Sequence, residues 1–252
     1  MDQPPDLIVA AGAEQLVLSP FSYCWFVGGQ GVCVDGIQTD PLPSLTVDDG
    51  EDLSVEFPLD WQIQATLLPG GDYCDGSLTV DVDPDGSPVE TLGSAGTYRV
   101  ELFGRGDQGD AAWAFELTTT DDRPSPPLSV QVLWYPSGQT LDAEAPFSAH
   151  IGNLTEKPAQ VSAVATVTSS NGSSQDFELT GGVAEECWGS TVSFDQPANL
   201  TSQVLELGPS PYDVELTLRI EGQKIMTPVI TWPDDFPSNS NESSRIPIEG
   251  AR

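Results

Sequence analysis

Basic residues are scarce in this chain of 252 residues. Eight lysines and arginines stand against 39 aspartates and glutamates, which gives a formal net charge of -31. The negative field that results repels nucleic acid and anionic lipid, so we exclude a nucleic-acid partner. An acidic surface of this kind keeps a secreted protein dispersed in solution.

Long apolar runs are also missing. No stretch of about 18 consecutive apolar residues occurs, so we expect no membrane span. The opening MDQPPDLIVAAGAEQ lacks the positive segment and the apolar core of a signal peptide. We interpret it as the start of a mature chain from which a signal or a lipid anchor has been removed. This interpretation predicts an extracellular or cell-surface protein.

Histidine occurs once, at His150, on a predicted strand. A Ser-His-Asp triad would have to use this residue, and we expect instead a half-buried strand histidine. No glycine-rich phosphate loop precedes a helix, and no pair of carboxylates stands out among the many acids. We therefore predict that the protein is not an enzyme, with no catalytic residue and no bound cofactor.

Apolar and polar residues alternate along most of the chain, a pattern that is typical of half-buried β-strands. The 24 glycines and 22 prolines indicate many turns and few long helices. The fold class predicted is therefore all-β. The expected strands lie in 52–59, 61–68, 77–83, 97–104 and 111–120, and then in 128–136, 147–154, 159–170, 174–181, 190–197, 202–208, 212–222 and 224–233.

A proline-rich segment separates two halves with the same strand pattern. Late in each half a tyrosine, Tyr98 or Tyr212, opens an alternating strand. This placement resembles the tyrosine corner of immunoglobulin-like sandwiches and predicts structural roles for both residues. We predict two tandem immunoglobulin-like β-sandwich domains, with the parts of the chain divided into 1–122, a linker at 123–127, 128–236 and a polar tail at 237–252.

The four cysteines are Cys24, Cys33, Cys74 and Cys187. One histidine and no C-x-x-C spacing exclude structural zinc, and an even count in an exported chain favours disulfides. A Cys24–Cys33 bond is favoured because the glycine-rich gap can fold as a hairpin, and it contributes about 2–3 kcal/mol. Cys74 and Cys187 then pair between the halves, for about 4–5 kcal/mol. The two other pairings of four cysteines stay open.

The segment DVDPDG at 81–86 places aspartates at alternate positions before a glycine. This is how a Ca²⁺ loop opens, and its ligands would be Asp81, Asp83 and Asp85. The glutamate that closes an EF-hand loop is replaced by Leu92, and no helices flank the segment. The alternative is a plain hairpin between 77–83 and 88–92, and both interpretations remain open.

Tryptophans occur in both halves and offer two roles. If their rings are exposed on one face, they form a platform that stacks on sugars. If the rings are buried, they pack the cores. Burial therefore distinguishes a carbohydrate-binding module from a protein-binding one. The six residues are Trp25, Trp61, Trp113, Trp134, Trp188 and Trp232.

Four segments resemble a group of uncharacterised secreted proteins and predicted lipoproteins of actinobacteria. They are SYCW with a second cysteine before VDG, VEFPLDWQIQATLLPGGDYC, TYRVELFGRGD and TWPDDFPSNSNE. The resemblance implies export, a lipid anchor on a cysteine that is missing here, and no known activity. The gap between Cys24 and Cys33 is longer than in that group. We expect a non-enzymatic protein with a protein or cell-envelope partner, the alternative being a carbohydrate- or Ca²⁺-binding module.

Overall fold

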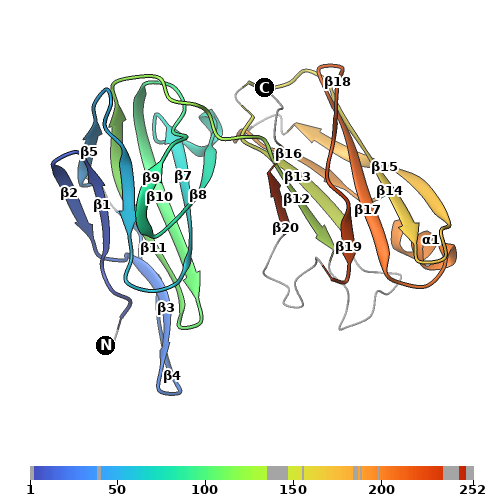
Figure 1. Cartoon of the computed structure of the whole chain (residues 1–252), viewed down its shortest axis with the longest axis horizontal. Coiled ribbons are helices and arrows are strands. Elements are labelled where there is room, and N and C mark those ends of the chain that lie inside the picture. Colours follow the sequence, from blue (N-terminus) through green and yellow to red (C-terminus); the bar gives the residue numbers. More distant parts are fainter. Residues whose placement is uncertain are drawn as a thin grey trace. The chain divides into compact units, whose positions relative to one another are not determined.

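The computed structural model describes residues 3–38, 41–134, 147–154, 156–183, 187, 189–197, 199–234 and 244–247. It is 57% strand and 5% helix, which confirms the all-β prediction (Figure 1). Two compact units divide the chain, Met1–Pro126 (unit 1) and Pro127–Arg252 (unit 2). No helix among the described residues is long and apolar enough to cross a membrane.

Unit 1 is a sandwich of two sheets that share one core. A four-stranded sheet has the order β2-β1-β6-β9, and a seven-stranded sheet has the order β4-β3-β11-β10-β7-β8, with β5 paired in parallel to β11 (Figure 1). The strands are β1 (Leu7–Ala11), β2 (Glu14–Leu18), β3 (Ser22–Val27), β4 (Gln30–Val34), β5 (Ser44–Val47), β6 (Leu53–Glu56), β7 (Gln62–Pro69), β8 (Leu78–Val82), β9 (Asp85–Val89), β10 (Gly96–Gly106) and β11 (Gly109–Thr119), with a 3₁₀ turn η1 (Tyr73–Asp75) before β8.

The core of unit 1 follows from the alternation in its sequence. Every second residue of β10, from Tyr98 through Val100 to Leu102, is buried, because successive side chains of a strand point to opposite faces. Aromatic rings fill one end of this core. The rings of Phe57 and Trp61 have centroids 5.1 Å apart, and those of Phe57 and Trp113 are 5.3 Å apart.

Unit 2 forms one continuous nine-stranded sheet that folds over its own core. Its order is β18-β17-β14-β15-β16-β13-β12-β20, with β19 paired to β17. Strand β15 pairs first with β14 and then with β16, so it passes from one face of the sandwich to the other. The elements are β12 (Ser129–Trp134), β13 (Phe147–Gly152), β14 (Val161–Ser169), β15 (Ser174–Val183), β16 (Val192–Asp195), α1 (Leu200–Leu207), β17 (Tyr212–Ile220), β18 (Gln223–Met226), β19 (Ile230–Trp232) and β20 (Ser244–Pro247).

Two sequence predictions of local structure are wrong. The segment 202–208 is not a strand, because α1 covers Leu200–Leu207 and buries Leu200 and Val204, which lie one helical turn apart. The hairpin between 77–83 and 88–92 does not form either. Strand β8 pairs with β7, whereas β9 pairs with β6 in the opposite sheet, so the chain between them crosses the sandwich.

The boundary between the units lies inside the predicted linker 123–127. Arg123 belongs to unit 1, since its guanidinium donates to the carbonyl of Glu51 at 2.6 Å and lies 2.9 Å from Asp121. The carbonyl of Pro127 instead accepts a hydrogen bond from Asn153 of unit 2. Within the predicted tail, Ser244–Pro247 adds an edge strand to β12, and the other residues of 237–252 lie outside the described residues.

Both tyrosines bond back to the main chain four residues earlier. The hydroxyl of Tyr212 donates to the carbonyl of Gly208 at 2.7 Å, and that of Tyr98 donates to the carbonyl of Ser94. This is the geometry of a tyrosine corner. Burial raises the pKa of both hydroxyls, and the charge of Asp122 raises that of Tyr98 further.

Removing the hydroxyl of Tyr98 and that of Tyr212 in separate variants is expected to lower the free energy of unfolding by unequal amounts. The carbonyl of Ser94 also accepts a bond from the hydroxyl of Thr119 at 3.3 Å, so it keeps a partner in Tyr98→Phe. Tyr212→Phe is expected to lower the free energy of unfolding by about 1–3 kcal/mol, and Tyr98→Phe by about 1 kcal/mol or less. Denaturant unfolding of the two variants checks this order, and a larger loss for Tyr98→Phe would contradict it.

Candidate interaction surface

The hairpin of β3 and β4 (Ser22–Val34) is closed by a two-residue turn. Gly28 and Gly29 both have positive φ angles, 64° and 82°, and the pair Val27 and Gln30 flanks them. A tight turn with two positive φ angles matches the twist of the strands that it joins, and glycine adopts it without steric cost. The local sequence therefore determines the turn and, with it, the register of the hairpin.

A disulfide joins the two strands of the hairpin. Cys24 and Cys33 lie directly opposite each other in the register and are bonded. Cys74 and Cys187 are also disulfide-bonded, so none of the cysteines is a free thiol. The pairing of Cys74 with Cys187 stays a prediction from the sequence.

Only the first part of β3 is joined to the sheet. It pairs with β11 from Ser22 to Trp25, and the last bond runs from the amide of Phe26 to the carbonyl of Gln108 at 2.7 Å. Beyond that bond the hairpin extends past the end of the sheet (Figure 1). The turn and the residues next to it, Val27–Gly31, therefore project from the body of unit 1, while Val32–Val34 lie beside the part of β3 that pairs with β11.

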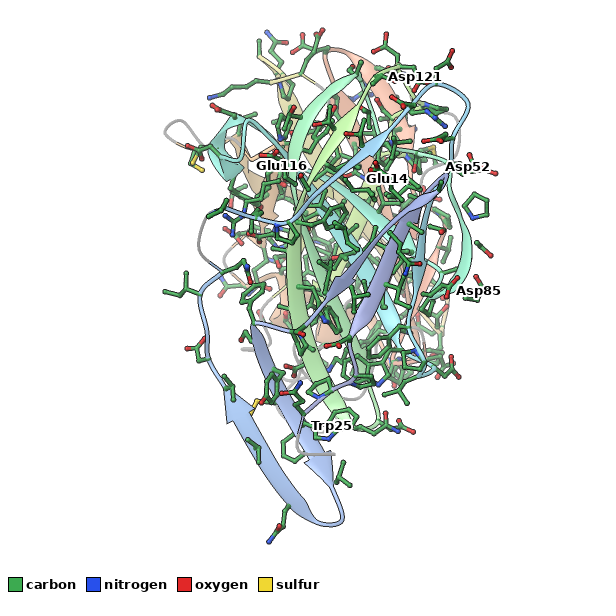
Figure 2. The ribbon with its side chains drawn as sticks, turned by 90° about the vertical axis from the view of Figure 1, so that its left-hand side faces the viewer. Glu14, Trp25, Asp52, Asp85, Glu116 and Asp121 are labelled. Carbon is green, nitrogen blue, oxygen red and sulfur yellow. A yellow bond between two sulfur atoms is a disulfide. The ribbon has the colours of Figure 1, made fainter. Side chains whose placement is uncertain are left out.

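Aromatic packing holds the base of the hairpin. Figure 2 shows Trp25 where the hairpin meets the body of unit 1. Its ring is buried and lies 6.0 Å from that of Trp61, whose indole N–H donates to the side chain of Gln108 at 2.9 Å. Gln108 therefore bonds both to Trp61 and to the amide of Phe26, which couples the hairpin to the core.

The hairpin exposes large apolar side chains. Val27, Val32 and Val34 share one face with the buried Trp25, whereas Phe26 lies on the opposite face over Gly31. A methyl group on Gly31 would lie 2.4 Å from the Phe26 ring, so glycine makes room for that ring. The exposed fractions are 55% for Phe26, 47% for Val27, 48% for Val32 and 40% for Val34.

Strand β4 has a free edge. Within the part of the chain that the structure describes it pairs with β3 alone, and all five of its residues are exposed. No charged residue occurs between Phe21 and Val34, in a chain with 19% charged residues. The acidic side chains labelled in Figure 2 all lie on the body of unit 1, away from the hairpin tip. The hairpin is thus an apolar, uncharged projection on an acidic protein.

The predicted Ca²⁺ ligands are not brought together. Asp81 and Asp85 lie on strands of opposite sheets, and Asp83 lies in the connection between these strands. Asp81 accepts a bond from the side-chain amide of Gln64 at 3.0 Å, and the hydroxyl and amide of Ser87 hold the pKa of Asp85 below its usual range. Among the described residues, no three His, Cys, Asp or Glu side chains are grouped closely enough to hold a metal ion.

His150 lies half-buried on β13, among hydroxyl groups. Its Nδ1 is 2.8 Å from the hydroxyl of Ser193, and its Nε2 is 3.3 Å from that of Ser148. Burial lowers the pKa of His150, and the negative charge of Asp195 partly opposes this. Both ring nitrogens bind serines, so neither is held by a carboxylate as in a Ser-His-Asp triad.

The tryptophans that the structure describes do not form a sugar-stacking platform. Each has 6% or less of its surface exposed, and Trp188 lies outside the described residues. The five rings pack in the two cores, where Trp134 and Trp232 of unit 2 have centroids 6.2 Å apart. They are Trp25, Trp61, Trp113, Trp134 and Trp232.

No protein-family model, curated protein or solved structure matches this chain. The resemblance to actinobacterial secreted proteins therefore stays a prediction from the sequence. Sequence reasoning identified the disulfide hairpin but not its projection or the free edge of β4. The missing charges between Phe21 and Val34 were the signal that could have indicated them.

Proposed function

We propose that the protein is a non-enzymatic extracytoplasmic interaction module whose β3–β4 hairpin binds an extended strand of a protein partner. The observation that carries this proposal is the free edge of β4, which is exposed, apolar and uncharged. Exposed edges in soluble proteins are commonly protected by charges, prolines or a covering loop. An edge whose only strand neighbour among the described residues is β3, and which has no charge or proline, is suited to accept another strand.

The side chains of the hairpin supply the apolar contacts that such pairing needs. Val32 and Val34 flank the free edge, and Phe26 offers an aromatic anchor on the other face. Aromatic anchors at the centre of an interface contribute much of its binding free energy. The disulfide between Cys24 and Cys33 lowers the conformational entropy that the hairpin loses when it binds.

Charge indicates the chemistry of the partner. The net charge of -31 disfavours contact between two copies of this chain, because their fields repel. A partner with an apolar strand and basic residues around it gains both the edge pairing and electrostatic attraction. We therefore propose a basic protein surface of the cell envelope as the partner.

An oxidising compartment supports the extracytoplasmic location. Disulfides persist outside the cytoplasm and are rare within it. All four cysteines of this chain are disulfide-bonded. The carbohydrate-binding alternative depended on exposed tryptophans, and those described are buried. The Ca²⁺ alternative depended on three aspartates that the fold keeps apart.

Capture by crosslinking at the surface of the source cells tests the proposal. We expect Val32→Asp to capture at least tenfold less of the protein that the unmodified chain captures, because the new charge lies at the proposed edge. Val17→Asp is the matched control, since Val17 is also an exposed valine, at 59% against 48% for Val32, and lies on β2 of the opposite sheet.

Both variants should keep the thermal unfolding of the original chain, because both sites are exposed. Equal capture by Val32→Asp and the original chain would contradict the proposal. So would equal losses in the two variants, since the hairpin would then have no special role. Failure of the original chain to capture any protein would count against it as well.

A further inference from the structure

Unit 2 contains a cleft of about 830 Å³ at the end of its sandwich. The segment 157–160 and the first residues of β14 form one wall. The end of β15 and the turn between β17 and β18 form the others. Its lining includes Lys157, Ser162, Gly182, Arg219 and Gly222. This volume lies within the range of small-molecule sites and is too large for a single inorganic ion to fill.

The cleft opens where β15 passes from one face of the sandwich to the other. Its pairing with β14 ends at Leu179, opposite Ala163, and from Thr180 onward it pairs with β16. The crossing requires glycine at position 181, where φ is 143° and a Cβ would lie 2.2 Å from the carbonyl oxygen of Ser193. As a result, the strand neighbour that Ser162 has among the described residues lies on the side of β17, and Ser162 lines the cleft.

Three of the five lysines and arginines of unit 2 lie at or next to this cleft. Lys157 and Arg219 line it, and Lys224 lies directly opposite Arg219 across the β17–β18 pair. Like charges at directly opposed positions of two strands repel each other. Neither Arg219 nor Lys224 forms an ion pair with a described residue. In a chain with only eight basic residues, this concentration needs an explanation.

The carboxylate of Glu221, near these cations, already accepts hydrogen bonds from the main chain. Glu221 follows Arg219 at the turn, and its side chain accepts hydrogen bonds from the amides of Ala159 and Gln160, the latter at 3.1 Å. Those bonds hold the segment 157–160 against the turn, which places Lys157 and Arg219 on the same cleft. An anion in the cleft would relieve the repulsion between the cations.

We propose that the cleft binds a small organic anion with a carboxylate or phosphate group. The planar guanidinium of Arg219 suits either group because it can donate two parallel hydrogen bonds. Lys157 and Lys224 add positive charge, and the apolar side chains of Val161 and Val183 in the lining contact the body of the ligand. This site is independent of the hairpin and of the proposed partner.

Titration of the full chain, followed by the amide NMR signals of Ser162, Gly182 and Gly222, tests the proposal. The probes are citrate and phenyl phosphate, with sodium chloride at matched ionic strength as the reference. We expect saturable shifts at these amides with at least one probe. Binding of citrate alone identifies a carboxylate ligand, binding of phenyl phosphate alone a phosphate ligand, and binding of both a shared anion site.

Two variants locate the site. Arg219→Gln is expected to weaken binding at least tenfold, and Lys157→Gln at least threefold, because each loses a positive charge that lines the cleft. Arg105→Gln is the matched control, since it removes an arginine from unit 1 and should leave binding unchanged. No saturable shift with either probe, undiminished binding in Arg219→Gln, or an equal loss in Arg105→Gln would overturn the proposal.

Discussion

Replacing Gly109 with alanine is expected to destabilise unit 1 by about 3–5 kcal/mol. Gly109 begins β11 with a φ of 136°, a conformation that L side chains rarely adopt. A Cβ there would lie 1.9 Å from the carbonyl oxygen of Cys24 and 3.4 Å from the Cα of Trp25. Both neighbours are main-chain atoms, which cannot move away as a flexible side chain could. The base of the hairpin must therefore separate from β11.

Hydrogen exchange of the full chain checks this prediction. The amides of β3 and of Phe26 should lose protection in Gly109→Ala, while those of unit 2 keep theirs. Gly28→Ala is the matched control. Gly28 also has a positive φ, of 64°, but a Cβ there would meet no atom within 4 Å beyond its chain neighbours, so about 1 kcal/mol is expected. Similar effects of the two substitutions would show that the contact with Cys24 is unimportant.

Trp61→Ala is expected to remove about 3–5 kcal/mol from unit 1, the usual cost of deleting a buried aromatic ring. Trp61 is 2% exposed, and its ring lies within 6.5 Å of those of Trp25, Phe57 and Trp113. Its indole N–H also donates to the side chain of Gln108. The main-chain carbonyl of Gln108 accepts the last hydrogen bond between β3 and the sheet, from the amide of Phe26. The substitution therefore loosens the hairpin as well as the core.

Trp61→Phe separates these two effects. Phenylalanine keeps most of the apolar contact but cannot donate to Gln108, so we expect a loss of about 1–3 kcal/mol and faster exchange at Phe26. Phe103→Ala is the control, because Phe103 is exposed on β10 and its loss should cost about 1 kcal/mol or less. Denaturant unfolding gives the energies. Unchanged exchange at Phe26 in both Trp61 variants would contradict the coupling.

Several elements followed directly from local sequence patterns. The alternation in 97–104 predicts a strand with one buried face, and β10 buries Tyr98 and Leu102 on that face. The glycines between Cys24 and Cys33 predict a hairpin, which β3 and β4 form. In these cases the deciding interactions are short in sequence or repeat along one strand, so composition and spacing are sufficient.

Other elements could not be predicted because distant contacts decide them. Residues 205–207 alternate between apolar and polar as they would in a strand, but the buried Leu200 and Val204 lie one helical turn apart, and α1 forms. The segment 81–86 contains the turn residues of a hairpin. Its flanking strands instead pair with β7 and β6, since the core of unit 1 lies between two sheets and each strand covers one side.

In the two candidate sites, too, some features follow from the local sequence and others depend on distant contacts. Amino-acid order determines that the Cys24–Cys33 hairpin lacks charge, and that basic residues are few. It does not show that β3 leaves the sheet after Trp25, because that depends on where β11 begins. Nor does it place Lys157 and Arg219 on one cleft, since they are distant in sequence and are brought there by the β14–β17 pairing and the bonds of Glu221.

By itself, the sequence determined the all-β class, the acidic surface, the hairpin turn and the alternating burial of the strands. Each of these depends on backbone preferences, charge or a period of two residues, which are local properties. The tertiary structure alone decided which strands share a sheet, which edge stays open and where β15 crosses to form the cleft. These depend on how buried surfaces fit together across the chain, and such packing has no local signature.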